Sequence, residues 1–326
     1  MLAADFFARE ECPVCAYPQF RTFYSCGMVD DPVKGFIATH YEGQGDVDWS
    51  LLENTDFVLC ECGRCGLVFQ KNAPTDHLLE NIYTKMINAT FLRELERTRL
   101  TIENFNAIAG ELSVLFKLAN KHPSEIRFLD FGCGTGRWAR VARAMGAQVF
   151  VTEIGEEKHK TAASIGATVL PDEAIDSERF DIVHTEQVFE HLVEPGREFR
   201  RLARATKRLM KIAVPRGGDI RDQVVRAGLP ARSPFKLSSE ETAFGREEYL
   251  YAAILPLEHL NAFAPRTIEY LAEQNGMAIR SRVRQSNVVV DQATLRSFAR
   301  SAAKLGKSFA RAILKPNTGY YVLQPR

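Results

Sequence analysis

The sequence predicts an α/β protein in which a doubly wound, mostly parallel sheet begins near residue 123, after a small cysteine-rich module and a helical linker. Three observations predict this. An apolar run at 126–131 leads directly into the glycine loop 132–136, and a second apolar run at 148–152 ends on Glu153. Two CxxC pairs lie nearer the N-terminus. A strand ending in a glycine loop, with a following strand that ends on an acid, is typical of a nucleotide-binding sheet.

Length and charge narrow the class of protein further. The chain has 326 residues, 42 of them basic and 41 acidic, and a net charge of +1. At roughly 150 residues per domain, this length predicts about two domains. The charge balance argues against a protein that binds nucleic acid through its overall charge. The longest apolar run, 249–257, is far shorter than the ~20 residues of a membrane-spanning helix. The N-terminus lacks the regions of a signal peptide, so we expect a cytoplasmic protein.

The cysteine spacing predicts a metal site. Cys12 and Cys15 form one CxxC pair, and Cys62 and Cys65 form a second. Two such pairs can place four thiolates tetrahedrally around Zn²⁺, and a four-thiolate site has no open position, so its role is structural. Cys60 could replace Cys62 as a ligand. The alternative to a metal site is a set of four reduced, buried cysteines; a thioredoxin-like redox pair is disfavoured because no βαβ pattern surrounds either pair.

These observations predict three parts of the chain. The zinc-binding module covers 1–73, a helical linker covers 74–122, and the α/β domain covers 123–326 with an insertion at 216–255. Long insertions of this kind are often lids, and we expect this one to shape the pocket of the substrate.

The glycine loop indicates which ligand the sheet binds. A dinucleotide fingerprint, GxGxxG, would need a third glycine where Arg137 stands. The observed pattern is DxGxGxG, which starts at Asp130, and it resembles the cofactor loop of class I S-adenosylmethionine-dependent methyltransferases. The resemblance implies that the loop packs against the methionine part of S-adenosylmethionine and that Glu153 accepts the ribose hydroxyls. The loop residues implied in cofactor binding are Asp130, Gly132, Cys133, Gly134 and Gly136.

The resemblance continues downstream and implies a Rossmann-like sheet of seven strands. Residues 185–192, TEQVFEHL, match the xxVxEHL motif that follows strand four in this family. The family fold implies that Asp172 borders the adenine and that Glu186 lines the cofactor pocket. It also implies that the seventh strand enters antiparallel between strands five and six. The expected strands three to seven cover 167–170, 180–184, 209–215, 278–283 and 319–323, and the expected helices cover 197–208 and 266–274.

The front of the chain is similar to that of bacterial sugar C-methyltransferases and their relatives. In those enzymes a CxxC…CxxCG module and a tyrosine-containing linker, here with Tyr83, precede the methyltransferase fold. A Glu-His pair after strand five, matched by Glu258 and His259, is implicated there in deprotonating the substrate. We expect no counterpart of their additional C-terminal domain in this chain. The resemblance therefore implies methyl transfer more firmly than it implies a sugar acceptor.

An acceptor that is a poor nucleophile must lose a proton during methyl transfer, and imidazole suits that task. We expect His259 to act as the base with help from Glu258; the alternative is that this pair caps the following helix. His191 is the second candidate, although the Glu190-His191 pair could instead organise the cofactor pocket. Tyr83 could close over the site from the linker, or simply pack there.

A basic segment near the end of the chain could contact a partner. Residues 291–315 carry six basic residues against one acidic residue, with apolar residues at helical spacing. The simplest interpretation is a helix packed on its own domain; the alternatives are contact with an anionic substrate or with an acidic membrane surface. Taken together, we expect a methyltransferase for a small-molecule acceptor, such as a nucleotide-linked sugar. The alternatives are a methyltransferase of protein or RNA, and a non-catalytic binding protein with the same fold.

Overall fold

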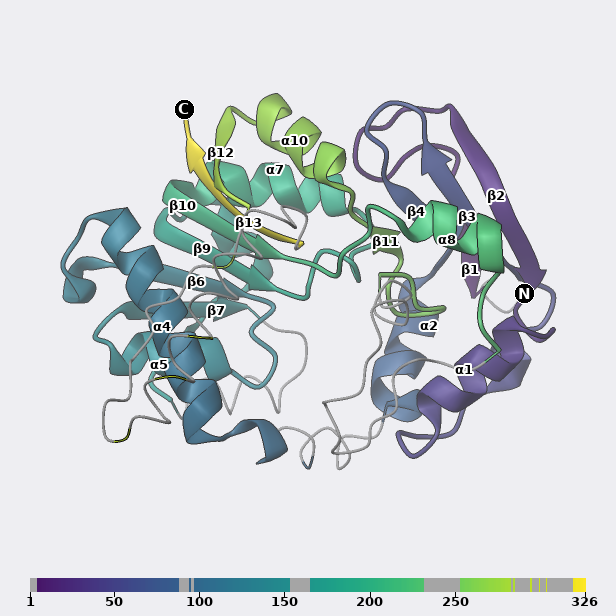
Figure 1. Cartoon of the computed structure of the whole chain (residues 1–326), viewed down its shortest axis with the longest axis horizontal. Coiled ribbons are helices and arrows are strands. Elements are labelled where there is room, and N and C mark those ends of the chain that lie inside the picture. Colours follow the sequence, from purple (N-terminus) through teal and green to yellow (C-terminus); the bar gives the residue numbers. More distant parts are fainter. Residues whose placement is uncertain are drawn as a thin grey trace. The chain divides into compact units, whose positions relative to one another are not determined.

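In the computed structural model the chain forms two compact units (Figure 1). The first unit comprises 1–98, 187–199 and 214–271, and the second comprises 99–186, 200–213 and 272–326. The structure describes residues 5–87, 94, 97–152, 165–231, 253–282, 284, 294, 299, 303 and 319–326. Within these residues no helix combines the length and apolar character needed to cross a membrane.

The second unit is built on a seven-stranded sheet. Its strands, in spatial order, are β12 (Met277–Ser281), β13 (Tyr320–Pro325), β10 (Thr206–Ala213), β9 (Phe180–Glu186), β6 (Arg127–Phe131), β7 (Gln148–Thr152) and β8 (Thr168–Val169). Strand β13 is antiparallel to both β10 and β12, and the pairs from β10 to β8 are parallel. The predicted α/β fold class and the antiparallel entry of the seventh strand are confirmed.

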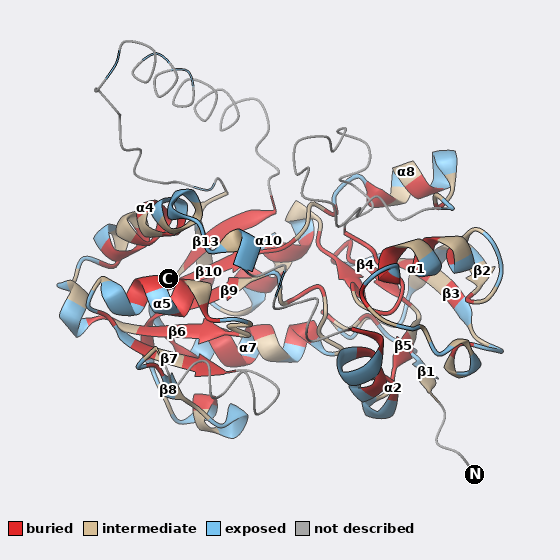
Figure 2. Cartoon of the chain, turned by 90° about the horizontal axis from the view of Figure 1, so that it is seen from below, coloured by how far each residue is buried: buried red, intermediate tan, exposed pale blue. Residues whose placement is uncertain are grey.

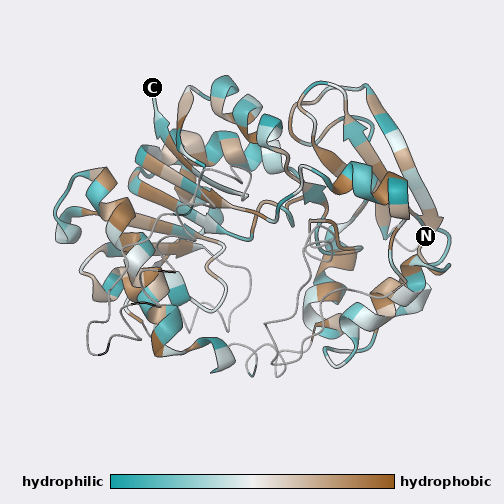
Figure 3. Ribbon diagram, viewed as in Figure 1, coloured by the Kyte–Doolittle hydropathy of each residue, from teal (hydrophilic) through white to brown (hydrophobic). Residues whose placement is uncertain are grey.

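Apolar residues hold this sheet against two helices. Helix α4 (Ile102–Ala119) packs beside α5 (Arg137–Ala144), and both contact the sheet (Figure 1). Their shared core includes Phe128, Trp138 and Ile182. The strands are mainly buried and hydrophobic. Helices α4 and α5 carry both buried and exposed residues, and both hydrophobic and hydrophilic ones (Figure 2 and Figure 3). This is the pattern expected of amphipathic helices that cover a buried parallel sheet.

The 3₁₀ helices η3 (Pro123–Glu125) and η4 (Asp172–Asp176) belong to the second unit, whereas the helices α7 (Pro195–Ala205) and α10 (Pro265–Gln274) begin in the first unit and end in the second. Helix α7 ends before its predicted end at 208, and strand β10 starts at Thr206. The hydroxyl of Thr206 donates to the carbonyl of Leu202 at 2.7 Å, which satisfies a carbonyl of the last helical turn and lets the chain turn into the strand.

The first unit contains two antiparallel sheets. The smaller pairs β1 (Phe6–Ala8) with β5 (Asn72–Pro74); the larger has the order β11 (Asn261–Ala262), β4 (Val68–Gln70), β3 (Asp56–Cys62) and β2 (Phe20–Gly27). The helices are α1 (Val33–Tyr41), the 3₁₀ helix η1 (Trp49–Leu51), α2 (Asp76–Asn81), the π-helix η2 (Ile82–Met86) and α8 (Ile220–Ala227). Buried apolar residues from several segments of this unit, the first at 28 and the last at 262, form one core. Phe36, Phe57 and Leu257 are almost fully buried in it.

The first unit consists of three separate segments of the chain, which the sequence does not predict. Residues 187–199 and 214–271 group with the N-terminal residues, although they lie within the predicted domain 123–326. Strand β11 explains part of this grouping, because it extends the N-terminal sheet through its pairing with β4. The predicted boundaries after 73 and 122 stay predictions. Most of the predicted insertion, 232–252, lies outside the described residues.

Candidate functional site

The glycine loop follows β6 and precedes α5, as predicted. Gly132, Gly134 and Gly136 have φ angles of 68°, 55° and 76°, a region that side chains with a Cβ rarely adopt. The amides of Gly132 and Cys133 donate to the carbonyl of Thr152 at 3.1 and 3.2 Å, which fixes the start of the loop on β7. A Cβ at Gly134 would meet no atom within 4 Å, so the loop backbone borders open space. This space suits a ligand that must approach the backbone closely.

Asp130 lies at the end of β6, almost fully buried, and its Oδ1 accepts a hydrogen bond from Nδ1 of His184 at 2.7 Å. Nε2 of the same ring lies 3.1 Å from the Lys211 ammonium, which can only donate; the ring is therefore neutral, with its proton on Nδ1. Burial holds the pKa of His184 well below its usual value, which agrees with a neutral ring. The centroid of the ring lies 4.5 Å from that of Trp138, so His184 has a structural role within the core of the second unit.

The burial of Asp130 has a consequence for the pH dependence of stability. Burial raises the pKa of Asp130 to about 7, so the folded protein holds a proton that the unfolded chain has already lost above pH ~4. Stability from this group is therefore lost as the pH rises from 4 towards 7. Asparagine has no carboxyl group to ionise, and its amide oxygen can still accept the hydrogen bond from His184. We therefore expect Asp130→Asn to reduce this loss of stability by a few kcal/mol.

Thermal unfolding of both proteins between pH 5 and pH 8 measures this difference. The wild type should lose more stability over this range than Asp130→Asn. Parallel curves for the two proteins would contradict the assignment, since every other titrating group is common to both.

The remaining predicted cofactor residues have protein partners or lie outside the described residues. Glu153 is in the latter group. In η4, Asp172 accepts from Arg201 through its carboxylate, at 2.7 Å, and through its backbone carbonyl. Glu186 ends β9 and forms ion pairs with Lys211 and, at 2.7 Å, with Arg284. The cofactor roles of these residues stay predictions.

A buried ionic network surrounds Lys211 in β10. The ammonium is fully buried, pairs with Glu186 and lies 3.8 Å from Glu111. Arg284 joins the same two carboxylates, each at 2.7 Å. Although burial alone would raise it, the pKa of Glu186 falls to about 2 because Lys211 and Arg284 stabilise the ionised form. Sequence analysis missed this network; the signal available was a lysine in the otherwise apolar strand 209–215.

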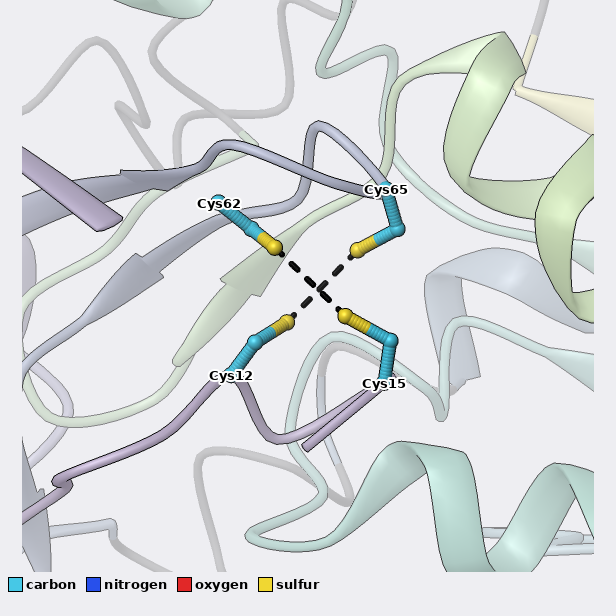
Figure 4. Close-up of side chains that lie close together, drawn as sticks. All are labelled: Cys12, Cys15, Cys62 and Cys65. Carbon is cyan, nitrogen blue, oxygen red and sulfur yellow. Dashed lines mark hydrogen bonds between the residues drawn. The ribbon is translucent and has the colours of Figure 1, made fainter. Parts of the chain in front are cut away.

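The four predicted cysteines of the metal site come together in the first unit (Figure 4). Their sulfurs all lie within 4.8 Å of one another, with 3.5 Å between Cys12 and Cys65 and between Cys15 and Cys62. A tetrahedral zinc ion with Zn–S bonds of ~2.3 Å needs sulfurs about 3.8 Å apart, so the donor set fits the ion. Cys60 is not in this group, and its sulfur lies 3.3 Å from the hydroxyl of Thr22.

The local backbone supports the two CxxC turns. The amide of Ala16 donates to the carbonyl of Cys12 at 2.9 Å, and that of Gly66 donates to the carbonyl of Cys62 at 3.1 Å. Ala16 and Gly66 both have positive φ angles. The amide of Arg64 lies 3.4 Å from the sulfur of Cys62, an arrangement that stabilises a thiolate. Residues 16–61 between the pairs form β2, α1, η1 and β3.

The predicted catalytic residues also belong to the first unit. The rings of His191 and His259 lie edge to face, with centroids 4.6 Å apart. The hydroxyl of Tyr83 lies 3.4 Å from Nδ1 of His191, and Tyr83 is 45% exposed. Donor atoms of Glu190, His191 and His259 all lie within 4.8 Å of one another. The structure therefore brings together Tyr83, His191 and His259, with Glu190 beside them.

Glu258 has a partner that sequence analysis missed. Its carboxylate pairs with Nε2 of His40 at 3.0 Å, and both side chains are largely buried. Although burial alone would raise it, the pKa of Glu258 falls to about 2, chiefly because of the hydrogen bond from His40. His40 lies on α1, 218 residues away in the chain. No motif in the sequence marks it.

The predicted basic helix at 291–315 lies outside the described residues, apart from 294, 299 and 303. The structure therefore leaves its partner as a prediction.

Comparison with known proteins identifies a family over more than half of the chain. A family model described as a methyltransferase domain matches residues 102–282. No match is found among curated proteins. Among solved structures, a SAM-dependent methyltransferase from Archaeoglobus fulgidus is similar, with 16% identity and a TM-score of 0.43 over 73% of this chain and 100% of that chain. A magnesium protoporphyrin IX methyltransferase from Synechocystis has 16% identity and a TM-score of 0.38 over 63% and 90%. A plantazolicin methyltransferase has 11% identity and a TM-score of 0.42 over 76% and 94%.

Proposed function

The chain belongs to the methyltransferase domain family, and from this premise we propose that it transfers a methyl group from S-adenosylmethionine to a small-molecule acceptor, such as a nucleotide-linked sugar. The glycine loop after β6 carries this proposal. Three of its glycines have positive φ angles, and its backbone at Gly134 borders open space. Both features suit a cofactor that lies directly against the backbone.

Asp130, Gly132, Cys133, Gly134 and Gly136 would hold S-adenosylmethionine, together with Glu153, Asp172 and Glu186. When bound, the cofactor supplies an electrophilic methyl group on sulfur. The protein's own contribution is then to orient the acceptor and to assist the loss of its proton. We assign this second task to the group of Tyr83, His191, Glu258 and His259, whose imidazoles can take or polarise a proton near neutral pH.

We also propose that the four cysteines hold a structural zinc ion. The sulfur spacing in the described structure supports this, as does the backbone amide that faces Cys62. All four coordination positions would be taken by protein thiolates. The ion would therefore stabilise the first unit without taking part in methyl transfer.

Calorimetric titration with S-adenosylmethionine tests the cofactor assignment through Gly134→Ala. A methyl group at this position would project into the space assigned to the cofactor, so we expect the affinity to fall at least about tenfold. Gly276→Ala is the matched control, because Gly276 has a similar φ of 63° and a Cβ there would likewise meet no atom within 4 Å. Both variants carry the same backbone strain, roughly 1 kcal/mol. Equal affinities for the two variants would contradict a cofactor at the loop.

A transfer assay separates the candidate acceptors. With the methyl group of S-adenosylmethionine isotopically labelled, we expect label to appear in a small molecule when nucleotide-sugars and phenols are offered. If the label appeared in peptides or RNA instead, the small-molecule acceptor would be contradicted and the protein would be a methyltransferase of protein or RNA. Tight cofactor binding with no transfer to any of these would support a non-catalytic binding protein.

A further inference from the structure

We propose that Glu190, His191 and His259 form a second metal site, for a divalent cation, separate from the four cysteines. One carboxylate and two imidazoles converge here, with donor atoms within 4.8 Å of one another. Glu190 is fully buried, and His259 is 9% exposed. All three residues belong to the first unit.

The donor set suits a cation with open positions. Two histidines and one carboxylate bind divalent transition metals in many proteins, and three protein ligands leave positions for water or substrate. Around an ion at ~2.1 Å, donor atoms lie about 3.0–3.4 Å apart, so small side-chain rotations would complete the site. The edge-to-face rings, at 89°, place the two imidazoles at an angle from which both can address one ion.

The backbone that carries the three ligands is held in place by Asn261. Its side-chain amide donates to the carbonyls of Leu192 and Glu190 at 2.7 and 3.4 Å, and its backbone amide donates to the carbonyl of Glu190 at 3.1 Å. Asn261 is fully buried and is two residues from His259. It therefore ties the segment of Glu190 and His191 to the segment of His259.

Two further side chains support the ligand geometry. The side-chain amide of Gln70 donates to the carbonyls of Leu255 and His259 at 2.8 and 2.9 Å, which fixes the backbone at His259. The hydroxyl of Tyr83 lies 3.4 Å from Nδ1 of His191. Such outer contacts orient ligating histidines in metal sites, and leave the other ring nitrogen, Nε2 in His191, for the ion.

The second unit offers a comparison. Glu111, His184 and Glu186 also bring donor atoms within 4.8 Å, but there the Lys211 ammonium supplies the positive charge. That group therefore needs no ion. In the group of Glu190 each imidazole offers a ring nitrogen that can bind an ion.

A bound cation would change the role that the sequence predicts for His259. The imidazole would be a ligand instead of a base, and an acceptor group on the ion would lose its proton more readily to solvent. This consequence rests on the proposed function, whereas binding of the ion does not.

Titration of the full-length, zinc-loaded protein with Mn²⁺, followed by electron paramagnetic resonance of the free ion, tests the proposal. A parallel titration uses Zn²⁺ against a competing chelator. We expect one additional ion per chain in the wild type. Glu190→Gln and His191→Ala should each weaken binding at least about tenfold. His77→Ala is the control, since His77 lies on α2 in the same unit with a 56% exposed side chain.

Circular dichroism and the content of cysteine-bound zinc establish that each variant is folded. Absence of an additional Mn²⁺ or Zn²⁺ ion in the wild type overturns the proposal, as does equal binding by the wild type and both ligand variants. Titration with S-adenosylmethionine on the same samples keeps the two proposals apart. Cofactor binding without the second ion contradicts only the metal site, and the reverse result contradicts only the proposed function.

Discussion

Cys62→Ser should leave the first unit without stable structure. Cys62 ends β3, and its sulfur lies 3.5 Å from that of Cys15, so a zinc ion at the four cysteines joins β3 to the N-terminal turn. Structural zinc supplies roughly 10–16 kcal/mol in small zinc-binding peptides, which is as large as the whole stability of a typical domain, ~5–15 kcal/mol. We expect the variant to lose its zinc and at least about 5 kcal/mol of stability.

The N-terminal turn also holds parts of the chain that are distant in sequence. The amide of Gly196 donates to the carbonyl of Pro13 at 3.1 Å, and the hydroxyl of Thr267 donates to the carbonyl of Cys65 at 3.0 Å. A Cβ at Gly196 would lie 2.8 Å from the Cα of Val14, which shows how closely the two segments approach. Loss of the ion should therefore loosen the starts of α7 and α10 as well as the turn.

Elemental analysis and thermal unfolding measure this result, and Cys60→Ser is the matched control. Cys60 is also a buried cysteine of β3, but it lies beside Thr22 and outside the four-sulfur group. We expect Cys60→Ser to retain about one zinc ion per chain. If Cys62→Ser retained its zinc while Cys60→Ser lost it, the ligand assignment would be reversed. If the wild type bound no metal, the cysteines would form a reduced core without an ion.

The parts of the structure that were predictable are those that the sequence encodes locally. The apolar run at 126–131 forms β6, and the glycine loop after it has the positive φ angles that glycine permits. The four cysteines Cys12, Cys15, Cys62 and Cys65 were also predicted to come together. Each CxxC turn places two sulfurs side by side, and one zinc ion needs two such pairs, so the spacing indicated the grouping although the pairs lie far apart in the chain. The strand, the glycine loop and each single CxxC turn depend on neighbours within a few residues.

The parts that were missed depend on contacts between distant segments. His40 pairs with Glu258 because α1 and the segment before β11 belong to one unit, and neither segment carries a motif that names the other. The alignment of strand β11 with β4 is of the same kind, since two residues are too short a strand to be predicted. The predicted helix 197–208 extends past the observed end of α7. Its run of charged residues continues through Lys207 and Arg208, which lie at the exposed start of β10.

Lys211→Met should cost the second unit about 3–5 kcal/mol of stability, the usual result of removing one partner from a buried ion pair. Methionine fits the volume of the lysine chain but removes the ammonium. Among the described residues that pair with both Glu111 and Glu186, Arg284 would then remain, and its side chain is 45% exposed. For a unit of this size the loss corresponds to a melting temperature about 10 °C lower. Lys121→Met is the control, since Lys121 pairs with Asp181 at 3.0 Å but is 24% exposed, and should cost only ~1 kcal/mol or less.

The loss in Lys211→Met should also depend on pH with a defined sign. Without the ammonium, burial raises the pKa of both carboxyl groups above the unfolded value, so the folded protein takes up protons that the unfolded chain does not hold. The deficit relative to the wild type should therefore be largest near pH 8 and shrink towards pH 5. Lys211→Met combined with Glu186→Gln should recover part of it at pH 8, because one uncompensated charge is gone while Arg284 still pairs with Glu111. A deficit that stays constant from pH 5 to pH 8, or a double variant no more stable than the single, would mean that Lys211 acts through packing and not through charge.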